Sequence, residues 1–370
     1  MSTAFAKKRD HEFIHRRGVE GAEDRRGKLE VFYAKLCVLR PSAVKDVVLF
    51  LDGSLRLLAL LVIAIGMTAG ACAAASGEPP AAAVEVASGV YMLPGSGAEP
   101  DAVNLGRIGN AGFIVGESGV VAIDTGTSYR HGTALLAAIG RVTDKPVLLA
   151  IVTHARQEFL FGAAAFRERG IPLAMHTRAA TLMASRCENC LKTLRQVLGE
   201  EAMRGTLIVK PNRSFDAAQR ENTLADRALQ VLYFGHSSGP GDIAVFDPRS
   251  GALFAGGLLE CGRIPDVIDS DLPRWRQALQ ELRKLPIKVV VPGHGPAGTG
   301  RSIDEVERYL TQLEARVRAL MKADTALDAI ADAASLAEFQ GWDQYDNTHR
   351  RNASIVFLRI EREQLFKSAE

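Results

Sequence analysis

The sequence has almost no net charge and no internal repeats. Its 45 lysine and arginine residues nearly balance 43 aspartate and glutamate residues, and residues 1–56 hold 12 of the basic and 8 of the acidic ones. The remainder is therefore close to neutral, which offers no case for nucleic-acid binding and indicates a protein that acts on small molecules. Its 370 residues, 47% of them hydrophobic, are enough for one large domain with a sizeable core.

Cysteine is scarce as well. Cys187 and Cys190 form a single CxxC pair, and a cysteine zinc site would need a second pair. A redox role would need a thioredoxin-like setting, of which the sequence has no sign. In an exported protein the CxxC spacing predicts a local disulfide, which leaves Cys261 without a partner.

An uncharged apolar run at residues 57–71 follows Arg56 directly. It has the length of a signal-peptide core and is short for a membrane span, which needs roughly 20 residues. We therefore assign 57–75 to a signal peptide or membrane anchor and expect a periplasmic protein that is held at the membrane through its N-terminal segment. The tetrapeptide ending at Cys72 resembles a lipoprotein cleavage box, so Cys72 is a candidate for lipidation. Cleavage at 73–75 and an uncleaved anchor are the alternatives.

The regions on either side of this segment differ in character. Residues 1–56 read as an N-terminal arm that is disordered or that precedes the true start of the protein, and residues 76–83 are a linker by composition. We expect a sheet-containing domain over 84–300 and a helical extension over 301–370 packed on it.

Strand-like runs and helical patterns alternate in the folded part. From Val84 onward, short β-branched runs separated by glycine turns indicate a meander, in which NLGRIG (104–109) is one strand. The alternation of helix and strand that follows indicates α/β layers. The helices we expect are 128–140, 158–169, 178–198, 273–285, 303–323, 326–339 and 347–366.

Four of the strand-like runs end at small or polar residues. These strand ends carry His154, His236, Gly257 and His294. Side chains at the carboxyl ends of strands in α/β folds project into an open crevice. We therefore expect these four positions to converge at one edge of the sheets.

The order of these four loops resembles the metallo-β-lactamase superfamily, from roughly residue 84 to the C-terminus. Within it, the quinoprotein relay system zinc metallohydrolases are the most similar. The shared segments are IGNAGFIVG (108–116), AIDTG (122–126), CGRIPDVID (261–269), VVPGHGP (290–296) and YDNTHRRN (345–352). The resemblance implies an α/β fold, namely a four-layer αββα sandwich with extra C-terminal helices.

The resemblance also implies a metal site, which here is degenerate. The family holds two zinc ions with the motif His-x-His-x-Asp-His, a later His, a bridging Asp and a last His. Three of these positions are kept, at His154, His236 and His294. Four are replaced, at Arg156, Glu158, Phe159 and Gly257. Asp124 matches a residue that orients the metal loop in the family, although Asp is also a common turn-former at a strand end.

Arg156 leaves three hypotheses for this crevice. In the first, it replaces the positive charge of the metal and pairs with Glu158 or binds an anionic ligand. In the second, the three histidines hold one ion and Arg156 turns outward. In the third, the histidines are hydrogen-bonded remnants. A guanidinium cannot ligate, and within about 4 Å it would repel a dication by several kcal/mol at an effective dielectric near 20. We therefore expect at most one zinc ion, with Phe159 filling the second site.

Two functions follow from the resemblance. One is an exported hydrolase-family protein with a degenerate metal site, in which Arg156, Glu158 and Asp124 are the candidate catalytic residues. The other is a metal-free binding or accessory protein of a periplasmic quinoprotein system. Either would take a small-molecule substrate or an anionic ligand.

Overall fold

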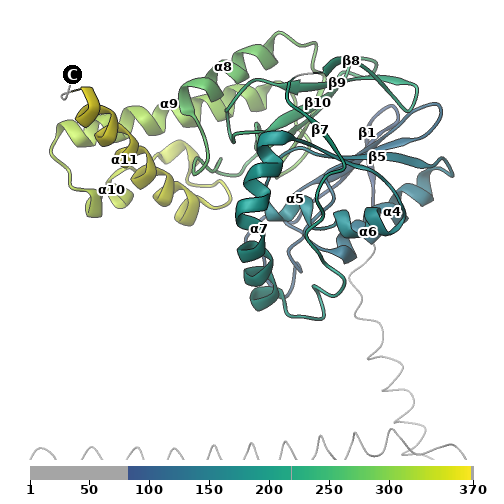
Figure 1. Cartoon of the computed structure of the whole chain (residues 1–370). Coiled ribbons are helices and arrows are strands. Elements are labelled where there is room, and N and C mark those ends of the chain that lie inside the picture. The colour runs from purple at the N-terminus through teal and green to yellow at the C-terminus, as the bar shows by residue number, and fades with distance from the viewer. Residues whose placement is uncertain (1–81, 218, 368–370) are drawn as a thin grey trace, which may run out of the picture. The chain divides into compact units, whose positions relative to one another are not determined.

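The computed structural model describes residues 82–217 and 219–367, whose elements are shown in Figure 1. The N-terminal arm, the segment 57–75 and Cys72 lie outside these residues. Over the ranges that are described, no helix is both long and apolar enough to cross a membrane.

The first sheet has seven strands in sequence order, from β1 to β7. The strands from β1 to β4 form the expected antiparallel meander, and those from β4 to β7 run parallel. Their bounds are β1 (Val84–Ala87), β2 (Val90–Leu93), β3 (Ala111–Val115), β4 (Val120–Ile123), β5 (Val147–Val152), β6 (Leu173–His176) and β7 (Arg213–Phe215).

The second sheet has five strands in the order β12, β11, β10, β9, β8. It is antiparallel from β8 to β11, and β12 lies parallel to β11. The bounds are β8 (Gln219–Leu224), β9 (Arg227–Tyr233), β10 (Ile243–Asp247), β11 (Ala252–Gly256) and β12 (Val289–Pro292).

Helices cover the outer face of each sheet. Figure 1 shows α4 and α6 on one side of the strands and α8 and α9 on the other. The first group is α4 (Tyr129–Val142), α5 (Gln157–Leu160), α6 (Ala163–Glu168) and α7 (Thr177–Leu198). The second group is α8 (Leu272–Arg283), α9 (Arg301–Lys322), α10 (Leu327–Ala333) and α11 (Arg350–Lys367), with the short turns η1 (Ala337–Phe339) and η2 (Tyr345–His349).

The layering follows from strands that are apolar on both faces. In β4, Val120 and Ala122 pack toward the helices of the first group, whereas Val121 and Ile123 pack into the core between the two sheets. Because neighbouring side chains of a strand point to opposite faces, a continuous apolar run predicts burial on both sides. The expected four-layer αββα sandwich with additional C-terminal helices is confirmed.

Some local expectations are wrong. The helix expected at 158–169 is broken into α5 and α6 at Gly162, whose amide leaves the helical ladder and donates to the carbonyl oxygen of Gly126 at 2.8 Å. Residues 104–109 form turns instead of a strand. The polar stretch from residue 212 to 228 contains β7 and β8, which its composition concealed.

Candidate functional site

Two of the four strand-end positions lie against the ring of Phe159, and a third lies beside one of them. The ring centroid of Phe159 is 4.1 Å from that of His154 and 5.2 Å from that of His294. Gly257 is beside His154, since a Cβ at Gly257 would lie 3.1 Å from His154 Cδ2. The side chains of Phe159, His154 and His294 are all buried. An apolar ring therefore occupies the space between two histidines that match zinc-ligand positions of the resembling family.

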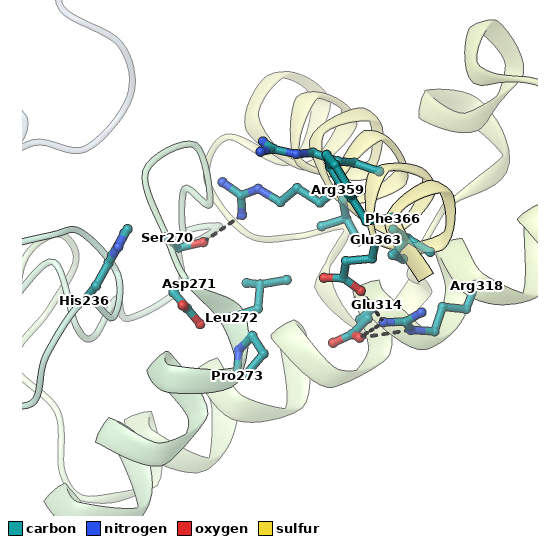
Figure 2. Close-up of a pocket in the computed structure, with 13 residues that line it drawn as sticks. His236, Ser270, Asp271, Leu272, Pro273, Glu314, Arg318, Arg359, Glu363 and Phe366 are labelled. Atoms are coloured by element: carbon teal, nitrogen blue, oxygen red, sulfur yellow. Dashed lines mark hydrogen bonds and ion pairs between the residues drawn. The ribbon is translucent and has the colours of Figure 1, made fainter. Parts of the chain in front are cut away.

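His236 is engaged elsewhere. Its Nε2 lies 2.6 Å from the carbonyl oxygen of Asp269, and its side chain lines a separate cavity of about 620 Å³. Figure 2 shows His236 at one edge of this cavity, across from Arg359 and Phe366 of α11. His236 still lies within electrostatic reach of Asp242, which is beside Gly257, but the carbonyl oxygen of Asp269 occupies its Nε2.

A hydrogen-bonded chain joins Asp124, Thr153 and His154. The Thr153 amide donates to Asp124 Oδ1 at 2.8 Å, and the Thr153 hydroxyl lies 2.9 Å from Asp124 Oδ2 and 2.8 Å from His154 Nδ1. When Asp124 is ionised the hydroxyl donates to it, so we assign the proton to Nδ1 of His154 and a lone pair to Nε2. That Nε2 is buried and has no partner in the described structure.

Burial has the largest effect on the pKa values of His154 and Asp124 in this hydrogen-bonded series. It lowers the pKa of His154 to about 3, with a further contribution from the Arg156 charge, so His154 is neutral at pH 7. It raises the pKa of Asp124 to about 7, although the hydrogen bonds from Thr153 oppose that shift. Asp124 also has a φ of 59°, in the left-handed region, which places its carboxylate under the loop that carries His154.

His294 lies between two carboxylates. Its backbone amide donates to Glu260 Oε2 at 2.7 Å, and its Nδ1 is 3.0 Å from Glu260 Oε1. On the other side of the ring, Nε2 is 3.3 Å from Glu158 Oε1, within ion-pair distance but not aligned as a hydrogen bond. Burial lowers the pKa of His294, but Glu260 and Glu158 outweigh burial and raise the pKa above its ordinary value.

The contact with His294 also lowers the pKa of Glu158. Burial alone would raise its pKa, yet His294 and then Arg156 lower it to about 2. Glu158 is therefore ionised beside an imidazole whose pKa is raised. A protonated imidazole has no lone pair for a metal ion.

Arg156 pairs with Asp266 and not with Glu158. Its Nη1 lies 2.9 Å from Asp266 Oδ2, and Arg351 Nη2 lies 2.9 Å from the same oxygen. The expected pairing with Glu158 is replaced because Asp266 reaches the guanidinium from the loop before α8, although Glu158 still adds to the field that raises the Arg156 pKa. Two guanidinium groups thus share one carboxylate.

Asp242 occupies the neighbourhood of the missing bridging ligand. A Cβ at Gly257 would lie 2.8 Å from Asp242 Oδ2, and Ser238 donates to the same oxygen at 2.7 Å. Burial raises the pKa of Asp242 to about 6. No pattern in the chain pointed to this carboxylate, because Asp242 precedes a strand and the strand-end pattern draws attention only to residues that follow one.

Two further residues support His294. Glu260, which receives both the amide and Nδ1 of His294, follows a buried apolar turn and has no distinctive spacing. Asn110 is simplest to read as a turn residue, but it is buried and its Nδ2 donates to the carbonyl oxygens of Pro292 and Gly295. Asn110 therefore fixes the loop that carries His294.

Cys187 and Cys190 are free thiols, not the expected disulfide. Both lie within the continuous helix α7, three residues apart. Residues at this spacing in a helix have Cβ atoms about 5–6 Å apart. A disulfide needs about 3.5–4.5 Å, so bonding the two sulfur atoms would require α7 to deform locally.

A cavity of about 260 Å³ opens above these groups. Its charged lining has four arginines and five carboxylates in addition to His294: Arg156, Arg186, Arg263, Arg351, Glu99, Glu158, Glu260, Asp266 and Asp269. One cluster has two arginines that share Asp266, and another has His294 between two glutamates. The lining thus has one more carboxylate than arginine, and its charges gather in these two clusters.

These contacts do not fit a dinuclear zinc site. Phe159 lies between His154 and His294, Nε2 of His294 faces a carboxylate, and Nε2 of His236 meets a carbonyl oxygen. Among the residues with described positions, no group of three or more His, Cys, Asp or Glu side chains is arranged to hold a metal ion.

Comparison with known proteins identifies relatives of the sandwich. A family model described as the metallo-beta-lactamase superfamily matches residues 105–294. The metallo-beta-lactamase type 2 of Bacillus sp. (strain 170) is 26% identical over 194 residues, which cover 50% of this chain and 67% of that protein.

Solved structures share the fold at lower identity. A metallo-beta-lactamase from Pontibacter korlensis superposes with a TM-score of 0.51 at 22% identity, covering 62% of this chain and 98% of its own. FIM-1 from Pseudomonas aeruginosa, in its mono-zinc form, superposes with a TM-score of 0.52 at 17% identity, covering 64% of this chain and 96% of its own. The two sheets, the order of the four strand-end loops and the match over half of the chain lead to one conclusion: this chain belongs to the metallo-β-lactamase superfamily.

Proposed function

We propose that this member of a hydrolase family binds a small anionic molecule in the 260 Å³ cavity and does so without the two zinc ions of the family. The observation that carries the proposal is the cluster of Arg156, Asp266 and Arg351, in which two guanidiniums share one carboxylate. Two guanidiniums and one carboxylate leave this cluster with one positive charge. Because a guanidinium offers a planar fork of donors, a carboxylate or phosphate is the matching ligand group.

The remaining arginines of the cavity are committed to other groups. Arg186 makes two contacts of 2.7 Å with Asp269, and Arg263 pairs with Asp343. The ligand is therefore expected to approach Arg156 and Arg351, with its less negative part toward Glu158. This arrangement corresponds to the hypothesis in which an arginine stands in for the charge of the metal.

The test compares matched arginine variants. Isothermal titration of the purified full chain with inorganic phosphate and a panel of small carboxylates should identify a ligand that Arg156→Ala loses by at least tenfold in affinity. Arg186→Ala, which removes an arginine of the same cavity that has its own carboxylate, should bind within about threefold of the parent protein. Equal losses in both variants would contradict the proposal.

Elemental analysis tests the metal part separately. We expect well under one zinc ion per chain in the tag-free protein, and a ligand affinity that a chelator leaves unchanged. Close to two zinc ions per chain, or binding that a chelator abolishes and zinc restores, would contradict the proposal.

A hydrolytic role is the second candidate, and His154 favours it. The buried Nε2 of His154 has no hydrogen-bond partner among the described residues, and both the His154 ring and the Asp242 carboxylate lie beside Gly257. Metal-independent hydrolysis of an ester or lactam that is lost in His154→Ala would support this role. Hydrolysis at the same rate in that variant would exclude it.

We also propose that the protein is exported to the periplasm and that it is an accessory protein of a quinoprotein system. Both proposals rest on the sequence alone. The apolar run at 57–71 after Arg56 supports export, and the quoted segments support the quinoprotein link. Cell fractionation should find the protein with the membrane, and a full-length protein wholly in the cytosol would refute export. Deleting the gene should lower the activity of a periplasmic quinoprotein, and unchanged activity would refute the link.

A further inference from the structure

The two thiols of α7 open on the ligand cavity. Cys187 and Cys190 are three residues apart in the helix, and both line the 260 Å³ cavity beside Arg186 and Glu158. Cys187 is buried and Cys190 is half-buried. The proposed anion site is formed by Arg156, Asp266 and Arg351, so the two thiols are a second chemical feature of the same cavity.

The two thiols are not equivalent. Cys187 is buried, whereas Cys190 is half-buried and more open to the cavity. The neighbouring Cys187 thiol lowers the pKa of Cys190 below its ordinary value, and the same neighbour relation, with burial, raises the pKa of Cys187. Because the thiolate is the reactive form, Cys190 is the nucleophile of the pair and Cys187 holds its proton.

Cys261 provides an internal comparison. It is buried against Ser302, whose hydroxyl lies 2.9 Å from its sulfur, and burial raises its pKa to about 11. Cys261 does not line the cavity. If the three thiols differed in nothing but position along the chain, a thiol reagent would react with all of them at the same rate. Their different surroundings predict different rates.

We propose that Cys190 and Cys187 form a dithiol site that reduces low-molecular-weight disulfides entering the cavity. The Cys190 thiolate bonds to one sulfur of the small disulfide, whose sulfur–sulfur bond breaks, and the other half leaves as a thiolate. Cys187 then loses its proton to that departing thiolate and attacks Cys190, which displaces the second half. The protein dithiol is oxidised by two electrons to a disulfide, and the small disulfide is reduced to two thiols.

The helix makes the oxidised form easy to reverse. Closing the Cys187–Cys190 bond requires the Cβ atoms to approach by about 1–2 Å from helical spacing, so α7 must deform locally. Strained disulfides are the more readily reduced ones. α7 contacts α5, which carries Glu158, so oxidation is expected to reshape the cavity wall.

The test uses the reduced full chain and hydroxyethyl disulfide, with peptide mass mapping of each cysteine over time. Cys190 should react at least tenfold faster than Cys261, and the final product should be a Cys187–Cys190 disulfide with two mercaptoethanol molecules released. Cys187→Ser should stop at a mixed disulfide on Cys190, and Cys190→Ser should show no fast phase. Equal rates at Cys190 and Cys261 would overturn the proposal, as would a mixed disulfide that persists on Cys190 in the parent protein.

A pH series separates this chemistry from simple exposure. In the parent protein the rate at Cys190 should reach half of its maximum at a lower pH than that of an ordinary thiol, because its pKa is lowered. In Cys187→Ser the midpoint should rise toward the ordinary thiol value, provided that its circular dichroism matches the parent. Cys187→Ala serves as the replacement if the serine variant does not fold. An unchanged midpoint in the folded variant would show that Cys187 does not stabilise the thiolate, and the proposal would be wrong.

Discussion

Replacing Asp124 with asparagine should stabilise the protein more at high pH than at low pH. The pKa of Asp124 is raised from 3.8 to about 7 in the folded protein, chiefly by burial. Between these two values the unfolded chain releases a proton that the folded chain keeps, so stability falls as pH rises. From pH 5 to pH 7 this loss is about two pH units at 1.36 kcal/mol each, or about 3 kcal/mol.

The asparagine side chain cannot ionise, so the variant avoids that loss. Its amide retains an oxygen for the Thr153 amide, which donates to Asp124 at 2.8 Å in the parent, and the Thr153 hydroxyl can reverse to bond His154. Urea unfolding should therefore show that Asp124→Asn gains about 3 kcal/mol relative to the parent between pH 5 and pH 8. This gain is the difference between the effects of the substitution on the free energy of unfolding at pH 8 and at pH 5. A cost of the changed hydrogen bonds that is the same at both pH values therefore cancels.

Asp247 is the matched control for this experiment. It is fully buried, and burial acts to raise its pKa as it does for Asp124, but Arg227 Nη2 lies 2.5 Å from its Oδ2 and holds the pKa below the usual range. Both the folded and unfolded forms of Asp247 are ionised from pH 5 to pH 8, so Asp247→Asn should destabilise by a constant amount. Parallel curves for the parent and Asp124→Asn would refute the assignment of a retained proton to Asp124.

Three other changes test the rest of the site. Glu158→Gln should destabilise the protein by about 3 kcal/mol at pH 7, because folding lowers the pKa of Glu158 from 4.5 to about 2. In the parent protein this contribution is present above pH 4.5 and is lost as the pH falls toward 2, which acid unfolding measures. Gly257→Asp should lower the urea midpoint by far more than Gly257→Ala, because two carboxylates about 4 Å apart repel by about 4 kcal/mol at an effective dielectric of 20 and Asp242 Oδ2 is already there. Phe159→Ala should cost about 3–5 kcal/mol in urea unfolding by leaving a cavity between His154 and His294, and a cost below about 1 kcal/mol would show that the ring does not fill that space.

The layers and the location of the crevice could be predicted from residue order alone. Runs such as Val120–Ile123, apolar at every position, can be buried only between two layers, and amphipathic helices must cover the outer faces. Strand ends at His154, Gly257 and His294 located the crevice, because strand direction alone decides which side chains reach the sheet edge. These properties depend on periodicity and order along the chain, which a single sequence carries in full.

The pairing of groups inside the crevice, in contrast, could not be predicted before the fold was known. Arg156 has Glu158 two residues away, yet it bonds Asp266 from a loop 110 positions later, and no local pattern encodes that choice. The same holds for Glu260 on His294 and for the carbonyl oxygen of Asp269 on His236. Charge pairing depends on distances of a few ångströms between segments remote in sequence, and the sandwich fixes those distances only once both sheets and their helices have packed.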